Sequence, residues 1–283
     1  MGHFVFQEDV FRIAKDKIDD ALDRMVSDIG RPLEDEVITL CRDLISGWTE
    51  EIFCDLFAIC LIGPAFSFAF SQLLTASILI EHSGKPEELY LYGQYHPASV
   101  ARFRVHQRLL EKLGWWKEIH GWTSAPVEVL RLCAGSASQF RVEVDLLCEE
   151  LETKLLSCYE ELCTWLIEYV PSIVKGHVDD VAGFHDQSPT IAEYLRRAIV
   201  PSTIILEGKI VHPRPVVLIN AGYRFLLEDF SLLLENIEVA KSEKSDSIRS
   251  RSWLTARLEL WLLKSLEDHR LLTGGISDHG SVA

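Results

Sequence analysis

Two carboxylates one helical turn apart are the residues of this sequence best suited to chemistry. Glu51 and Asp55 stand at the head of an uncharged run of 25 residues that ends at Ile80. A carboxylate is costly to bury in an apolar helix unless a cation, a metal ion or a hydrogen-bonding histidine lies beside it. Downstream, His96 begins a His-Pro pair, and Arg102 follows the proline by five positions. These residues predict a buried charged site that is built around the Glu51 helix.

The order of these residues resembles a family of zinc peptidases. Glu-x-x-x-Asp-x-x-Ala, an apolar helix with a Gly-Pro break, then His-Pro and an arginine at this spacing are similar to the HtpX and CAAX-prenyl-endopeptidase gluzincins. The resemblance covers roughly residues 1 to 110. It implies that Glu51 is a zinc ligand and that Asp55 orients a ligand histidine. His96 and Arg102 would support catalysis by facing the cleft or bracing its wall, although Arg102 also suits a surface ion pair on its helix.

The motif that defines such peptidases, His-Glu-x-x-His, supplies two histidine ligands and a general base, and it is absent from the 283 residues. The chain opens with Met1, Gly2 and His3, which read as the back half of His-Glu-Met-Gly-His. On this interpretation His3 is the second zinc ligand, and the first ligand and the base lie upstream. We therefore expect that the chain from Met1 binds zinc weakly or not at all and has no appreciable peptidase activity.

Composition indicates an ordinary folded protein. Apolar residues make up 48% and charged residues 25% of the sequence, and the net charge of −15 argues against nucleic acid or an anionic membrane as a partner. Seven cysteines form no Cys-x-x-Cys pair, which favours free thiols in the cytoplasm. The uncharged run is long enough to span a bilayer. Its Gly63-Pro64 break and acidic flanks favour two buried helices instead, so membrane association is not expected.

Periodicity predicts an all-α fold with, at most, one short β pair. The N-terminal region, residues 1–114, contains amphipathic helices over 4–29, over 33–48 and from 51 onward, and another over 98–113. The segment between 81 and 93 is predicted to be a loop. We expect residues 115–283 to form a second helical region that packs on the first as one unit.

In this second region a long helical pattern runs over 126–170, with a break near Gly135. Apolar residues with this spacing form a continuous stripe along the helix. Such a stripe packs against partner helices in the same chain or in a homo-oligomer. Residues 176–189 read as a loop whose histidines and aspartates could bind a metal, and Thr190 with Glu193 as the capping box of a short helix. Residues 204–210 suit a strand pair or a linker, and two helices over 216–239 and 252–272 close the chain.

Two functions fit these observations. The first is a zinc metallopeptidase-like protein that acts on peptides or proteins in its complete form, and the second is a non-catalytic helical interaction or scaffold protein. The sequence holds no Gly-x-Gly-x-x-Gly, Walker loop or Gly-x-Ser-x-Gly elbow, which argues against nucleotide binding and serine hydrolysis.

Overall fold

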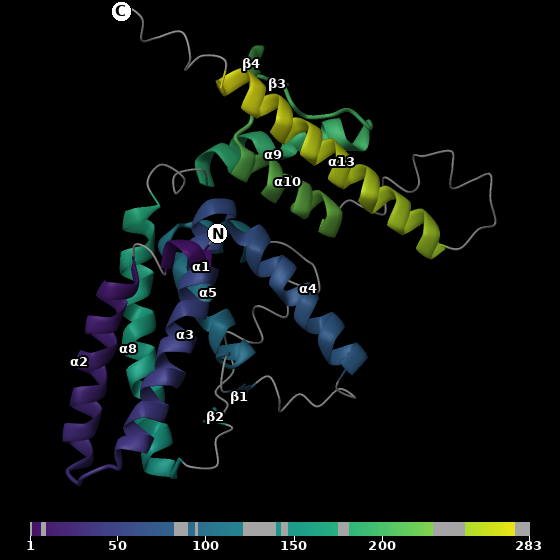
Figure 1. The fold of residues 1–283 in the computed structure, drawn as a ribbon. Coiled ribbons are helices and arrows are strands. Elements are labelled where there is room, and N and C mark those ends of the chain that lie inside the picture. The colour runs from purple at the N-terminus through teal and green to yellow at the C-terminus, as the bar shows by residue number, and fades with distance from the viewer. Residues whose placement is uncertain are drawn as a thin grey trace, which may run out of the picture.

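A computed structural model describes residues 2–6, 10–81, 90–93, 96–120, 140–142, 147–174, 181–228 and 247–274. Figure 1 shows a bundle of helices whose upper end is covered by a second helical layer. The bundle contains α1 (Gly2–Val5), α2 (Phe11–Ile29), α3 (Asp35–Ile62), α4 (Pro64–Glu81), α5 (Ser99–Lys112), α6 (Trp115–His120) and α8 (Glu149–Ile173). The second layer contains α9 (Val181–Arg196), α10 (Pro215–Glu228) and α13 (Ser247–Gly274). The all-α prediction is therefore confirmed.

The described residues also form four short strands. β1 (Leu91–Tyr92) pairs in parallel with β2 (Arg141–Val142), and β3 (Ile204–Leu206) pairs antiparallel with β4 (Lys209–Val211). The second pair confirms the strand alternative for residues 204–210. Its turn residues Glu207 and Gly208 both have positive φ, at 49° and 78°, as a tight two-residue hairpin turn requires. The parallel β1–β2 pair was not predicted.

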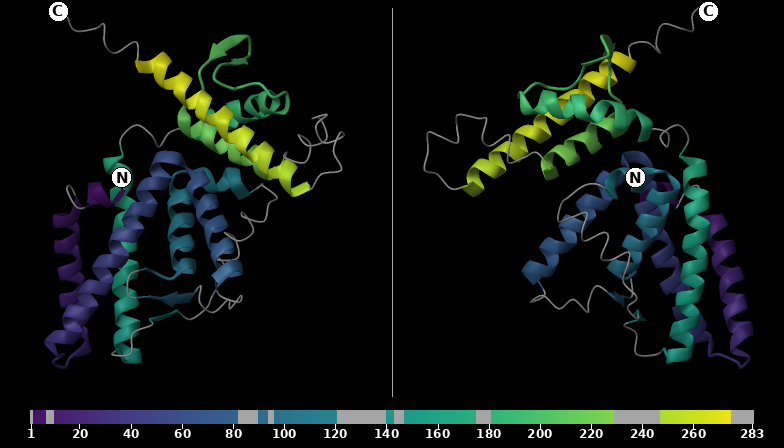
Figure 2. Two further views of the ribbon diagram at one scale, coloured as in Figure 1. Left: turned by 45° about the vertical axis from the view of Figure 1, so that its right-hand side comes forward. Right: turned by 180° about the vertical axis from the view of Figure 1, so that it is seen from behind.

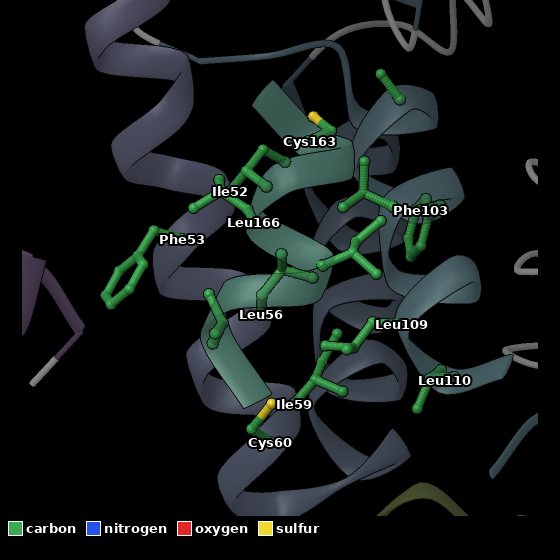
Figure 3. Packing of buried hydrophobic residues seen from close by; sticks show 14 of the residues in the cluster. Ile52, Phe53, Leu56, Ile59, Cys60, Phe103, Leu109, Leu110, Cys163 and Leu166 are labelled. Carbon is green, nitrogen blue, oxygen red and sulfur yellow. The ribbon is translucent and has the colours of Figure 1, made fainter. Parts of the chain in front are cut away.

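The central helix of the bundle is α3. It lies beside α2 and α8 on one side and α5 on the other (Figures 1 and 2). Figure 3 shows Ile52 and Leu56 of α3 packed with side chains of α5 and α8, including Phe103 and Leu166, and all four are buried. A helix with buried residues on several faces is a core helix, which explains why this part of the sequence is so apolar.

The predicted break at Gly63-Pro64 is confirmed, and a residue from the second layer stabilises it. α3 ends at Ile62 and α4 begins at Pro64, a favourable first helical position for proline. Asn220 of α10 donates hydrogen bonds from Nδ2 to the Ile62 carbonyl at 2.9 Å and to the Val216 carbonyl at 2.7 Å. Its Oδ1 accepts one from the Ala65 amide at 2.9 Å. One buried amide thus satisfies groups at both helix ends and ties α10 to the bundle.

The predicted division of residues 33–62 into two helices is wrong. α3 runs without interruption from Asp35 to Ile62 and passes through Gly47. A glycine inside a helix costs only about 1 kcal/mol. The buried side chains of Trp48 and Ile45 beside it outweigh that cost. The N-terminal helix predicted over 4–29 appears as α1 and α2, and residues 7–9 between them lie outside the described part.

The predicted long helix over 126–170 is wrong at its centre. Arg141 and Val142 form a strand, and α8 begins only at Glu149, with three acidic side chains in its first turn that favour a helix start there. α8 also continues past Pro171 to Ile173. Residues 126–139, with the predicted break near Gly135, lie outside the described part of the chain.

The loop predicted for residues 176–189 is also wrong where the structure describes it. α9 begins at Val181 and includes Pro189, because Phe184, Ile191 and Leu195 are buried along one of its faces. Glu193 forms ion pairs with Arg196 and Arg197, and the helix around it does not begin at Thr190, so the predicted capping box is wrong. Among the proposed loop ligands, His185 and Asp186 lie on α9. His177, Asp179 and Asp180 are not described.

The structure contains both of the last two predicted helices, but their first and last residues differ from the prediction. α10 occupies the start of the helix predicted over 216–239, whose residues 229–239 are not described, and α13 begins five positions before residue 252. Residues 82–89 of the loop predicted between 81 and 93 are not described either. Within the described ranges, no helix combines the length and apolar character needed to cross a bilayer.

Candidate functional site

The centre of the site is the carboxylate of Asp55, a residue in the C-terminal third of α3 that is 2% exposed. Arg102 of α5 donates to it twice, from Nε to Oδ2 and from Nη2 to Oδ1, each at 2.7 Å. Two short parallel bonds of this kind are the strongest pairing that a guanidinium and a carboxylate make. They join α3 to α5 across the apolar core.

His106 completes the coordination of Asp55. It lies one helical turn after Arg102 on α5, so both side chains project from the same face. Its Nε2 is 2.9 Å from Asp55 Oδ2. An ionised carboxylate only accepts hydrogen bonds, so Nε2 carries the hydrogen. Oδ2 therefore accepts from both Arg102 and His106.

The surroundings of His106 are aromatic. The residue is 0% exposed, and its ring centroid lies 5.7 Å from that of Phe66, 5.4 Å from that of Phe70 and 5.8 Å from that of Phe103. Phe70 also stacks under the Arg102 guanidinium, whose carbon lies 4.4 Å from the ring centroid. Asp55, Arg102, His106 and these phenylalanines, contributed by α3, α4 and α5, are here called the Asp55 cluster.

The cluster keeps Asp55 ionised. Burial on its own would raise the pKa of Asp55, but the interactions with His106 and Arg102 outweigh burial and lower this pKa below its ordinary value of 3.8. Burial would likewise lower the pKa of Arg102, and the hydrogen bonds and charge of Asp55 raise it instead. The pair is therefore a charged pair at any pH near neutrality.

Glu51 lies one turn before Asp55 on the same face of α3, at the edge of the cluster. Its side chain is 20% exposed, and its Oε2 is 3.5 Å from Arg102 Nη2 and 3.6 Å from His96 Nδ1. The His96 side chain is 67% exposed. The same Arg102 nitrogen thus reaches both Asp55 and Glu51. The Glu51 carboxylate is braced from the buried side and open toward solvent.

The backbone of α1 places His3 close to this part of α3. α1 packs on α3, and a Cβ atom built on Gly2 would lie 3.1 Å from both Cα and Sγ of Cys54. Cys54 follows Glu51 by three residues, so the helix that carries His3 touches α3 within one turn of Glu51. The side chain of His3 lies outside the described part of the structure.

The structure thus brings together four of the residues that the sequence singled out: Glu51, Asp55, His96 and Arg102. The Arg102 side chain is only 13% exposed and pairs with Asp55, so it does not form the surface ion pair that was the alternative. His106 was missed; the one signal in the sequence was its position four residues after Arg102, which places both side chains on one face of a helix. Within the described residues, no group of three His, Cys, Asp or Glu side chains is arranged to hold a metal ion.

Comparisons with family models, with curated proteins and with solved structures found no match. The likeness to the gluzincin peptidases therefore stays a prediction from the residues of the sequence.

Proposed function

We propose that this chain is a zinc metallopeptidase-like protein in which Glu51 is a zinc ligand. The observation that supports the proposal is the environment of the Glu51 carboxylate. It is partly exposed, braced by Arg102, faced by the His96 imidazole and adjacent to the helix that carries His3. A glutamate oxygen and a histidine nitrogen are ligands that zinc commonly takes in catalytic sites.

In this proposal the chain would supply two zinc ligands. Glu51 and His3 would hold the ion, and Arg102, fixed by Asp55, would hold the glutamate in place. Zinc, when bound in a peptidase, polarises the peptide carbonyl and lowers the pKa of a coordinated water. His-Glu-x-x-His does not occur in the 283 residues, so they offer no glutamate in the usual place of a general base. We therefore expect weak zinc binding and no appreciable peptide cleavage from these residues alone.

Replacing Glu51 by glutamine tests the proposal. Glutamine keeps the size of the side chain but removes its negative charge. Loss of a group that only orients a ligand weakens metal binding by about ten- to a hundredfold. Loss of the ligand's own charge should cost at least as much, so we expect the zinc dissociation constant to rise by about a hundredfold or more. A competition titration with a chromophoric chelator measures it. Glu50→Gln is the matched control, because Glu50 precedes Glu51 on α3 and projects about 100° away around the helix. Equal zinc affinity in the two variants would contradict the proposal.

A second candidate function is a non-catalytic interaction protein. Large apolar side chains are exposed in the second layer: Ile205 and Ile210, which face each other across the hairpin, are 61% and 72% exposed, and Leu260, Leu263 and Leu271 of α13 are also exposed. Exposed apolar groups that lie close together are typical of contact surfaces. In this case the Glu51–Asp55 pair is a structural relic, and Glu51→Gln changes stability but not zinc content.

A further inference from the structure

α13 has apolar side chains on two opposite sides, one of which packs on α10 while the other is exposed. On the inner side Leu258 is buried, and a Cβ atom built on Gly222 of α10 would lie 2.5 Å from Leu262 Cδ1. Each residue of a helix is turned by about 100° from the one before it, so Leu260 and Leu263 point away from this contact. They are 54% and 61% exposed. Figure 2 shows α13 as the outer helix of the second layer.

The exposed side of α13 has the spacing of a coiled-coil seam. Four exposed residues follow one another at intervals of four, three and four positions: Ala256, Leu260, Leu263 and Glu267. This is the alternation of d and a positions in a heptad. The seam is apolar from Ala256 to Leu263 and then charged, with Glu267 at an a position and Arg270 at the next d position. A polar residue at an a position fixes the register of the partner helix.

The charges beside the seam are complementary to those of a second copy of the same helix. Glu259 and Lys264 are exposed and occupy a g and an e position. In a parallel pair of helices, a g residue faces the e residue five positions further along the partner, so Glu259 of each copy meets Lys264 of the other. Leu266 and Leu271 have the same relation and add an apolar contact. An antiparallel pair would instead bring the two e sides together, with Lys264 against Arg257.

We propose that α13 is a dimerisation helix, through which two copies of the chain associate in parallel with Leu260 and Leu263 at the centre of the interface. The two-fold axis runs along the helices, and α10 and the bundle lie on the far side of each α13, so the contact with α10 is kept. The described seam is short, and short interfaces are typical of reversible association. The proposal goes beyond the proposed function, since it uses no residue of the Asp55 cluster and does not depend on zinc.

Sedimentation equilibrium of the full chain over the micromolar range measures the dimer dissociation constant. Leu260→Glu and Leu263→Glu each place a charge at the centre of the seam, and we expect each to raise this constant by about thirtyfold or more, as loss of a central interface residue does. Leu73→Glu is the matched control, because Leu73 is an exposed leucine of α4, and it should leave the constant unchanged. All three leucines are exposed, so the variants should keep the circular dichroism spectrum and the unfolding midpoint of the wild type.

Charge reversal tests the parallel arrangement. Glu259→Lys and Lys264→Glu should each weaken the dimer, because each creates two like-charged pairs across the interface, and the double variant should recover the wild-type dissociation constant. Lys264 also pairs with Glu267 and Asp268 of its own helix. Those pairs stay broken in the double variant, so its recovery reports contact between the two chains. In an antiparallel dimer, Lys264→Glu alone would strengthen association, since the new carboxylate would face Arg257.

A wild-type chain that stays monomeric at every concentration would overturn the proposal. A dimer whose dissociation constant is the same in Leu260→Glu and Leu263→Glu would also overturn it, because the contact would then lie elsewhere. A monomer that Leu260→Glu destabilises would show that another segment of the same chain covers the seam. A dimer that Lys264→Glu strengthens would overturn the parallel arrangement.

Discussion

Replacing Asp55 by alanine is expected to lower the free energy of unfolding by about 3–5 kcal/mol, which is typical for removing one partner of a buried ion pair. The change leaves the Arg102 guanidinium and the His106 Nε2 hydrogen in the core without their acceptor. Urea denaturation at pH 7 measures the effect. Asp43→Ala is the control on the same helix. Its side chain is exposed, so we expect a change within about 0.5 kcal/mol.

The pH dependence of this effect has a definite sign. The pKa of Asp55 in the folded protein lies below 3.8, its ordinary value, so the unfolded state binds more protons in the acid range. The stabilisation by ionised Asp55 is therefore fully present above that value and is lost as the pH falls through the folded-state pKa. We expect the difference in stability between the wild type and Asp55→Asn to shrink below pH 3.8. A difference that stays constant from pH 7 to pH 3 would contradict the account of the Asp55 cluster.

Replacing Gly63 by alanine is expected to lower the free energy of unfolding by about 3 kcal/mol, because two costs add. The residue has φ of 67° and ψ of −154°, a conformation that costs a residue with a side chain about 1–3 kcal/mol. In addition, a Cβ atom would lie 2.8 Å from Asn220 Nδ2, which donates to the Ile62 carbonyl at the end of α3, while Oδ1 of the same amide accepts from the Ala65 amide of α4. The substitution therefore strains the backbone and displaces the amide that ties α10 to the bundle.

Gly30→Ala is a comparison variant with a smaller backbone cost and no side-chain contact, because Gly30 lies in the left-handed α region, with ψ of 12°. Gly30 also has positive φ, at 66°, but no atom lies within 4 Å of a Cβ built there. We expect it to lose only the backbone part, about 1–2 kcal/mol. Thermal or urea unfolding of both variants gives the comparison. Equal losses for Gly30→Ala and Gly63→Ala would show that the contact with Asn220 does not contribute.

The helical fold and the main features of α3 and α4 could be predicted from the sequence, because their signals are local. The uncharged run after Asp55 indicated buried helices, and Gly63-Pro64 marked the break between them. The errors at 141–142 and 181–189 have another origin. The exposed side of α9 carries His185 and Asp186. Polar residues at this density are typical of loops, so the sequence predicted a loop there. The buried face of α9, with Phe184 and Ile191, is recognisable only once a helix is assumed.

The site was predicted in part for a related reason. Glu51 and Asp55 stand beside an uncharged run, and His96 and Arg102 follow it at the spacing of the resembled family, so these four residues could be predicted. Which of them meet depends on the packing of α3 against α5, which the spacing of residues along the chain does not specify. His106 was missed because its spacing from Arg102 shows only that the two share a helix face, and many pairs of residues in an amphipathic helix do so. Its role appears only when Asp55, 51 positions earlier, is placed beside it.

The most direct test of the central claim is the location of bound zinc in crystals of the protein grown with the metal, determined from anomalous scattering at the zinc absorption edge. The account predicts a peak about 2.0–2.2 Å from an oxygen of Glu51, with the His3 imidazole as a second ligand and Asp55 still paired with Arg102. A map without a peak at Glu51, in which its carboxylate remains against Arg102 and His96, would contradict the account.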